Sequence, residues 1–225
     1  MIEIRKPTLI VSAALFLAFL VFTLLVAVVD VSGGVVFGTE IGFSSINLAF
    51  YRATQKSGAY TPSLYKISEY LGYLALIEAA AFAIYGVVQA IKRKSVKKAD
   101  ADVYVLAAIY VLTVIFYVLF EVAIVNYRPV VFELGKIEAS YPSSHTVLSC
   151  VIVGTGAFML RRRISRKPVR IAVEVCSALV VAATVACRAF CGVHYLTDII
   201  GGLLLSASLV TLFAAFLPKE QTAAA

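Results

Sequence analysis

The sequence predicts an all-α, polytopic membrane protein that crosses the bilayer six times and forms one membrane-embedded domain over residues 1–225. Hydrophobic residues make up 61% of the chain. The mean hydropathy of +0.94 exceeds what a soluble domain of this length carries without large exposed apolar patches. Six apolar stretches meet or approach the ~20 residues that a helix needs to span a bilayer. Charged residues, only 15% of the total, cluster between these stretches, outside the hydrocarbon core where a charge is costly.

The predicted spans follow one another with short connections. In chain order they are residues 8–29, 67–91, 103–125, 145–160, 171–190 and 196–217. The first stretch is longer than the core of a signal peptide, and no small-residue cleavage site follows it, so we interpret it as a retained transmembrane helix. The fourth stretch is the shortest of the six and carries the weakest signal.

Two short connections are strongly basic, at residues 92–98 and 161–170. Six spans place both on the same side of the membrane, together with Arg5, Lys6 and Lys219 near the chain ends. The positive-inside rule makes this side cytoplasmic. We therefore expect a multi-pass protein of the cell membrane with both termini in the cytoplasm. The net charge of +7 is interpreted as this orientation signal and not as a sign of nucleic-acid binding.

Three segments are left on the opposite, extracytoplasmic side, at residues 30–66, 126–144 and 191–195. The first mixes Gly, Ser and Thr with apolar residues. Within it, residues 41–53 form either a helix lying on the outer surface or an irregular loop, and the sequence favours neither. No internal repeat or low-complexity tract is apparent, and the four cysteines lack the paired spacing of a zinc site.

Polar residues that are unusual for this chain converge on the predicted extracytoplasmic side. They follow the third span, precede the fourth, and lie at the junction of the fifth and sixth. The group comprises Arg128, Ser143, Ser144, His145, Arg188, His194 and Asp198, and it includes both histidines of the protein. Distant parts of the chain are therefore predicted to meet in one pocket.

A phosphate or a similar oxyanion is the natural ligand of this group. Arg128 and Arg188 offer planar forks of N–H donors that match phosphate oxygens and keep their charge at accessible pH. Ser143 or Ser144 stands where a helix N-cap is expected, with neighbouring backbone N–H groups directed at an anion.

Two histidines beside a phosphate can divide the work of phosphoryl transfer, one attacking phosphorus and the other protonating the leaving alkoxide. His194 and Asp198 are four residues apart. If the helix begins near His194, this spacing stacks them on one face, so that the carboxylate holds one ring nitrogen and leaves the other free to attack. His145 has no carboxylate nearby in the sequence and is the better candidate for the acid.

In order and spacing, these residues resemble the three-part signature of the type 2 phosphatidic acid phosphatase (PAP2) superfamily. The matching elements are Arg128-Pro129, then Pro142-Ser143-Ser144-His145, then Arg188 with His194 and Asp198, over about residues 100–217. The resemblance implies a PAP2-like bundle of six membrane helices and a metal-independent phosphohydrolase with a phosphohistidine intermediate and no cofactor.

By this resemblance each residue receives a role. His194 would be the nucleophile, Asp198 its orienting partner and His145 the general acid. The phosphate cradle would consist of Arg128, Arg188 and the backbone of Ser143 and Ser144.

The chain departs from this pattern at three positions. Glu121 occupies the place of the usual lysine, seven residues before Arg128, and so lies two helical turns, roughly 10 Å, deeper on the same face. It either pairs with Arg128, meets a cationic group on the substrate or is protonated, and Lys136 is a candidate to supply the missing positive charge. Ser144 replaces the usual Gly, and Cys187 a frequent Ser.

The leading hypothesis is hydrolysis of a lipid phosphate or pyrophosphate monoester at the extracytoplasmic face. Phosphatidic acid, phosphatidylglycerophosphate and polyprenyl pyrophosphates are candidate substrates, and nothing in the sequence chooses among them. The alternatives are a lipid phosphotransferase and a non-catalytic phospholipid-binding or transport protein. The expected partners are the lipid substrate and the bilayer, with no nucleic acid, and the oligomeric state is left open.

Overall fold

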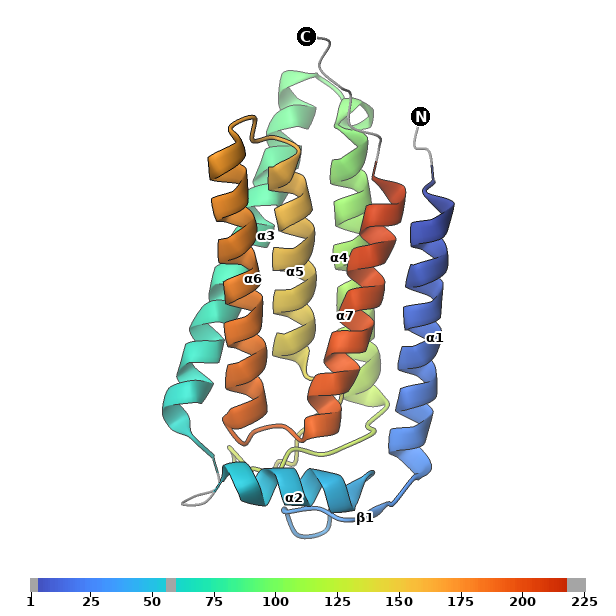
Figure 1. Cartoon of the computed structure of the whole chain (residues 1–225), viewed down its shortest axis with the longest axis vertical. Helices are drawn as coiled ribbons and strands as arrows, with labels where there is room; N and C mark the ends of the chain where they lie inside the picture. Colours follow the sequence, from blue (N-terminus) through green and yellow to red (C-terminus); the bar gives the residue numbers. More distant parts are fainter. Residues whose placement is uncertain (1–3, 56–59, 218–225) are drawn as a thin grey trace.

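The computed structural model describes residues 4–55 and 60–217, and within these ranges it is an all-α structure built around six long apolar helices (Figure 1). The helices are α1 (Lys6–Val28), α3 (Pro62–Lys92), α4 (Ala101–Val122), α5 (Ser144–Arg161), α6 (Lys167–Phe190) and α7 (Leu196–Phe216). Each is long and apolar enough to cross a membrane. The predicted fold class and the six spans are confirmed. Lys219, predicted on the cytoplasmic side, lies outside the described residues.

Proline marks the start of three of these helices. Its fixed φ suits the first turn, and the N–H that it lacks would have no intrahelical acceptor there. Pro7, Pro62 and Pro168 stand within the first two positions of α1, α3 and α6. The helix α3 therefore begins five residues before the predicted span, and its 31 residues extend about 46 Å at 1.5 Å per residue. That length exceeds the ~30 Å hydrocarbon core.

The centre of the bundle is formed by α5 and α7, which bury 56% and 50% of their most apolar windows, against 6% for α6. The helix α5 packs against α3, α4, α6 and α7 (Figure 1). Protein, not lipid, therefore surrounds much of α5, and this explains why its sequence is the least apolar of the six.

Helix α1 packs along α7 through small polar residues. The hydroxyl of Ser12 donates to the carbonyl of Ser208 at 2.9 Å, and the hydroxyl of Ser208 donates back to the carbonyl of Ser12 at 3.2 Å. Such reciprocal bonds between small side chains let two backbones approach closely inside a membrane.

The end of the bundle at which α5 and α7 begin is covered by α2 (Ser44–Thr54), which lies across the helix ends (Figure 1). A helix is therefore present in the segment for which the sequence left helix or loop open. Before it, a two-stranded antiparallel ribbon pairs β1 (Ser32–Gly33) with β2 (Glu40–Ile41), which the sequence analysis did not predict.

The basic connections 92–98 and 161–170 lie at the opposite end of the bundle, where α1 begins and α7 ends (Figure 1). The first contains a short 3₁₀ helix, η1 (Val96–Lys98). The second is anchored through Arg163, which lies 3.1 Å from the carboxylate of Asp102 and 4.9 Å from the centre of the Tyr85 ring. The predicted grouping of the basic loops is thus present, whereas their cytoplasmic location and the single-domain interpretation stay predictions.

Candidate active site

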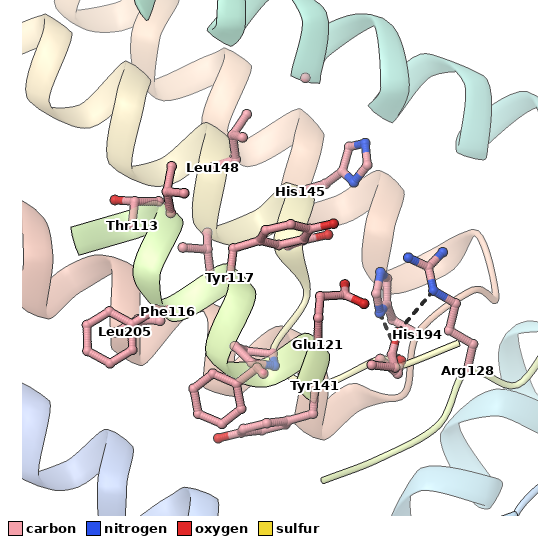
Figure 2. Close-up of a pocket in the computed structure, with 18 of the residues that line it drawn as sticks. Thr113, Phe116, Tyr117, Glu121, Arg128, Tyr141, His145, Leu148, His194 and Leu205 are labelled. Atoms are coloured by element: carbon pink, nitrogen blue, oxygen red, sulfur yellow. Dashed lines mark hydrogen bonds between the residues drawn. The ribbon is translucent and has the colours of Figure 1, made fainter. Parts of the chain in front are cut away.

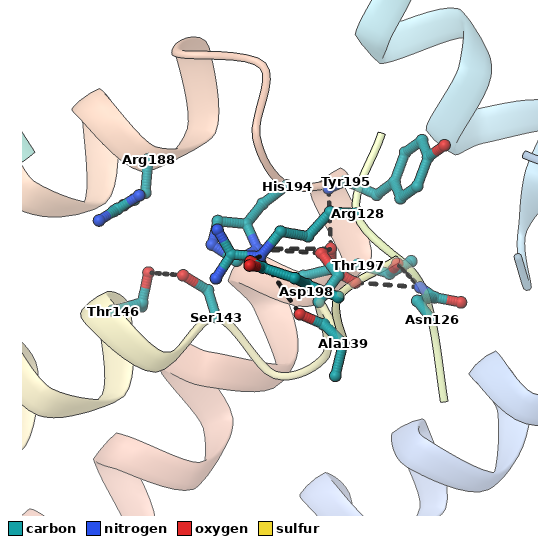
Figure 3. A network of polar contacts seen from close by, with 12 residues as sticks. Asn126, Arg128, Ala139, Ser143, Thr146, Arg188, His194, Tyr195, Thr197 and Asp198 are labelled. Carbon is teal, nitrogen blue, oxygen red and sulfur yellow. Dashed lines mark hydrogen bonds and ion pairs between the residues drawn. The ribbon is translucent and has the colours of Figure 1, made fainter. Parts of the chain in front are cut away.

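The candidate site lies at the end of the bundle opposite the basic loops, where the α4–α5 connection meets the 191–195 turn between α6 and α7 (Figures 1 and 3). The α4–α5 connection folds back on itself. The amide of Arg128 donates to the carbonyl of Glu138 at 3.0 Å, and the amide of Ser140 donates to the carbonyl of Asn126 at 2.9 Å. This pairing fixes Arg128 and Ser140 on a common backbone frame.

Asp198 is fully buried in the first turn of α7, and both of its carboxylate oxygens accept hydrogen bonds (Figure 3). Oδ1 accepts from the side-chain amide of Asn126 at 3.0 Å. Oδ2 accepts from the hydroxyl of Ser140 at 2.5 Å and from the backbone N–H of Tyr195 at 2.8 Å. An acidic side chain in a first helical turn also interacts favourably with the helix dipole, so these contacts fix the position of the carboxylate.

His194 is 2% exposed and reaches Asp198 through Ser140. The Ser140 hydroxyl lies 3.0 Å from Nδ1 of His194, while Nδ1 is 3.7 Å from Oδ2 of Asp198. Because Ser140 gives its single proton to the carboxylate, its oxygen accepts from Nδ1–H of His194. This assignment leaves the lone pair of Nε2 free, and Nε2 has no hydrogen-bond partner among the described residues.

This arrangement differs in detail from the expected direct contact. Helix α7 begins at Leu196, with Tyr195 as its N-cap, so His194 lies in the turn before the helix and not on its face. The separation of 3.7 Å between Nδ1 and the carboxylate is too long for a hydrogen bond. The serine, which the sequence analysis did not single out, bridges the gap.

Burial lowers the pKa of His194 to about 4, against the opposing effect of the Asp198 carboxylate, and the nearby Arg128 lowers it further. The imidazole is therefore neutral at pH 7. A neutral ring with a free nitrogen is the state that a histidine nucleophile requires.

Arg188 lies in the last turn of α6 and is fully buried. Its guanidinium lies 5.0 Å from the centre of the Tyr65 ring, and none of its three nitrogens has a hydrogen-bond partner among the described residues. A buried charge without partners costs several kcal/mol. An anion beside this guanidinium would supply the missing hydrogen bonds.

Arg128 is half-buried and lines a pocket together with His194. Its Nε donates to the carbonyl of Ala139 at 3.3 Å and lies 3.3 Å from the carboxylate of Glu138. Both polar contacts of the guanidinium use Nε, so in the described part of the chain the two terminal nitrogens remain available to a ligand.

His145 is the second residue of α5, and its side chain lines the pocket with that of His194 (Figure 2). It packs directly on the backbone of α3. A Cβ added to Gly72 would lie 3.1 Å from Cδ2 of His145, which is tighter than an ordinary contact. Both imidazoles and the guanidiniums of Arg128 and Arg188 are close enough to interact electrostatically. The two histidines and two arginines predicted from the sequence therefore meet at one place.

The two serines before α5 differ in their contacts. Ser144 lines the pocket, in keeping with its expected position. Ser143 is fully buried; its amide donates to the carbonyl of Asp198 at 3.0 Å, and its hydroxyl accepts from Thr146 at 3.0 Å. Its amide is therefore engaged within the protein, contrary to its predicted place in a phosphate cradle.

Lys136 lies away from the pocket, contrary to its suggested role as a replacement positive charge. It belongs to a tight turn with Glu133, whose carboxylate is 3.9 Å from its ammonium, and its side chain is 63% exposed. Gly135 makes this turn possible with a φ of +81°. Glu121, by contrast, lines the pocket from the last turn of α4, and the carboxylate paired with Arg128 is that of Glu138.

The pocket has a volume of about 400 Å³ and joins polar to apolar surroundings (Figure 2). One end holds Arg128, His145 and His194. The walls toward the bundle interior are apolar side chains from α3, α4, α5 and α7, among them Leu76, Phe116, Phe120, Leu148 and Leu205. A molecule with a charged head and an apolar chain matches this division.

Several contributing residues gave little sequence signal. Asn126 and Ser140 hold Asp198, and Glu138 pairs with Arg128, but each is a common polar residue in a connection between spans. Asn126 precedes Arg128 by two residues, and this proximity was the only feature of the sequence that pointed to Asn126. The contribution of Ser140 depends on the fold-back of the loop.

Comparison with known proteins supports this interpretation of the fold. The model of the PAP2 superfamily matches residues 103–222. The crystal structure of a transmembrane PAP2-type phosphatidylglycerolphosphate phosphatase from Bacillus subtilis is similar over 91% of this chain and 93% of that chain, with a TM-score of 0.64 and 18% sequence identity. None of the curated proteins compared with the chain matches it.

Proposed function

Because this chain belongs to the PAP2 superfamily and is a membrane-embedded phosphatase, we propose that it hydrolyses a lipid phosphate monoester with His194 as the nucleophile. The observation that carries the proposal is the free Nε2 of the buried His194, which lies near two arginines. Among the described residues, Arg188 has no hydrogen-bond partner and the ion pair of Arg128 uses only Nε. Together they suit the attack of imidazole on a phosphorus atom held by positive charge.

A lipid substrate follows from the shape and the lining of the pocket. Its polar end continues into apolar walls, and α3 and α4 carry many exposed apolar side chains on their outer faces, such as Leu74, Val111 and Val118. The volume of about 400 Å³ is in the range of small-molecule sites, ~300–1,000 Å³, and accommodates a phosphorylated head with the first part of its chain. The rest of the chain would stay in the bilayer.

In the first step, Arg128 and Arg188 bind the phosphate oxygens and neutralise the charge that develops on them. Nε2 of His194 forms a bond to phosphorus as the bond from phosphorus to the lipid oxygen breaks. His145 gives its proton to the departing oxygen. The ring of His194 becomes cationic, and its Nδ1–H bond to Ser140, backed by Asp198, strengthens.

In the second step, water replaces the histidine. His145, now neutral, takes a proton from the water, whose oxygen bonds to phosphorus while the bond from phosphorus to Nε2 breaks. Inorganic phosphate leaves, and both histidines return to their starting states.

The site would face the outside of the cell. It lies at the end of the bundle opposite the basic loops, and the positive-inside rule supports a cytoplasmic location for those loops. An impermeant thiol reagent applied to intact cells is expected to label Phe37→Cys, in the β1–β2 loop, and to leave Val96→Cys, in η1, unlabelled. The reverse pattern would contradict the orientation.

Phosphate release by the purified chain in proteoliposomes tests the activity, with a panel of long-chain lipid phosphates. His194→Ala is expected to abolish release, whereas Glu40→Gln, exposed on β2 and outside the pocket, is the matched control. With ³²P-labelled lipid and rapid quenching, the wild type is expected to carry an alkali-stable, acid-labile label on the protein during turnover, and His194→Ala is expected to carry none. Full activity in His194→Ala would overturn the proposal.

A further inference from the structure

Two carboxylates face the same pocket as the histidines. Glu69 comes from α3 and Glu121 from α4, and both line the cavity with Arg128, His145 and His194. Within residues 4–55 and 60–217, neither carboxylate lies in a salt bridge, and Arg128 pairs with Glu138. Glu69 is close enough to Arg188 to interact with its charge. The proposed mechanism uses neither of them.

Glu69 lies close to the proposed acid. It precedes Gly72 by three residues, and both line the pocket from the same face of α3. The backbone of Gly72 touches the ring of His145, so Glu69 is less than one helical turn, about 5 Å along the axis, from that contact. It also interacts with the hydroxyl of Tyr65, whose ring lies against Arg188.

Glu121 approaches the pocket from the other side. Thr113, Tyr117 and Glu121 are spaced four residues apart on α4, and all three line the cavity, so they form one pocket-facing stripe. Figure 2 shows the Glu121 side chain reaching from α4 toward the part of the pocket that holds His194. The cavity is thus flanked by a carboxylate on each of its two outer helices.

Two negative charges beside a phosphate site oppose binding of a simple phosphate dianion, because like charges repel at this range. The same charges favour a ligand that carries a positive group next to its phosphate. The buried, unpartnered Nε2 of His194 is an independent sign that a phosphate-bearing ligand enters this cavity, and the carboxylates define what else that ligand carries.

We propose that Glu69 and Glu121 bind a protonated amine on the substrate, so that the preferred substrates are lipid phosphate monoesters with an ammonium group close to the phosphate. This inference rests on the proposed function and narrows its substrate class. Glu69 and Glu121 are specificity-determining residues, since they contact the ammonium and not the reacting atoms.

A matched pair of substrates tests the inference on the full chain in proteoliposomes. One is a long-chain alkyl 1-phosphate with an amine on carbon 2, and the other carries a hydroxyl at that carbon. We expect kcat/KM to be about tenfold higher for the amine, the size expected from two partly exposed ion pairs. Glu69→Gln and Glu121→Gln are each expected to lower this ratio about threefold, and the double variant to bring it near one.

The activity on the hydroxyl substrate reports whether each variant is folded. It is expected to rise a few-fold in the double variant, because a repulsive charge has been removed. Glu121→Lys is expected to bring the ratio near one, because a repulsion replaces one of the two attractions, and the exposed Glu40→Gln is expected to leave the ratio at its wild-type value.

Three results would overturn the inference. The first is a ratio near one in the wild type. The second is a ratio that the two Gln substitutions leave unchanged. The third is a preference that vanishes on chelation and returns with Mg²⁺, which would mean that a divalent cation bridges carboxylate and phosphate. Each leaves the proposed function intact, whereas failure to release phosphate from any lipid phosphate of the panel refutes the proposed function itself.

Discussion

Removing the hydroxyl of Ser140 tests the link between Asp198 and His194 most directly. Ser140→Ala deletes the bonds of 3.0 Å to Nδ1 and 2.5 Å to Oδ2, and leaves the ring and the carboxylate 3.7 Å apart with no bridge. In the ground state the ring is neutral, so its bond to Ser140 is of ordinary strength. In the transition state the ring is cationic, and the bond is charge-assisted and about twice as strong.

The expected loss follows from this difference. A hydrogen bond to a charged group contributes about 1.5–3 kcal/mol and one between neutral groups about 0.5–1.5 kcal/mol. The difference of about 1–1.5 kcal/mol corresponds to a fall in kcat of roughly 5- to 13-fold at 1.36 kcal/mol per tenfold. KM is expected to change by less than about threefold, because the arginines that bind phosphate are untouched. Single-turnover formation of the phosphohistidine, followed by rapid quench, measures the affected step.

Ser206→Ala is the matched control. It also removes a buried hydroxyl, one that donates to the carbonyl of Gly202 within α7, away from the site. Ser140→Thr keeps a hydroxyl and is expected to recover part of the rate. A kcat for Ser140→Ala within twofold of wild type, in protein of normal thermal stability, would refute the serine relay.

The remaining predictions concern pH, packing and the unpaired arginine. Because the pKa of His194 is lowered to about 4, its ring stays neutral as the pH falls through 6.5. We therefore expect kcat at saturating substrate to persist to about pH 5 and to fall only below it. A fall in kcat with a midpoint near pH 6.5 would contradict this. Gly72→Val places a Cβ 3.1 Å from Cδ2 of His145 and so crowds the ring, and kcat is expected to drop about tenfold with little change in KM. Gly33→Val, whose added Cβ meets no atom within 4 Å, should not alter kcat, and equal rates for the two variants would exclude the packing role. Arg188→Met removes a buried charge without a hydrogen-bond partner, so it is expected to raise the Tm of the ligand-free protein. The same variant is expected to lose activity and to lose the rise in Tm that vanadate gives the wild type. A lower Tm in the ligand-free variant would indicate that the protein already neutralises this arginine.

Much of the architecture follows from local rules that the bilayer imposes. Hydrocarbon cannot satisfy backbone polar groups, so each long apolar stretch must form a helix, and counting such stretches yields the fold class. The fourth span, from Ser144 to Arg161, was hardest to recognise because α5 is shielded from lipid by its neighbours and needs fewer apolar residues. The sequence of α2 was equally ambiguous. A helix on the surface buries only one face, so it needs few apolar residues.

The convergence of both histidines and both arginines was also predictable, because each stands at the end of a span on the same side of the membrane. The details of the loops were not. Lys136 lies near Arg128 in the sequence, yet the turn at Gly135 carries it away from the pocket. Ser143 lies beside His145, yet its amide is used by the carbonyl of Asp198.

The sequence by itself therefore determined the number of membrane crossings, the end at which the polar residues meet and the chemistry that they suit, because hydropathy and residue type depend on no distant contact. Only the tertiary structure decided that Ser140 stands between His194 and Asp198, that Glu138 pairs with Arg128 and that Glu69 and Glu121 line the same pocket. These relations join residues on different elements, and the packing of one helix against another sets them.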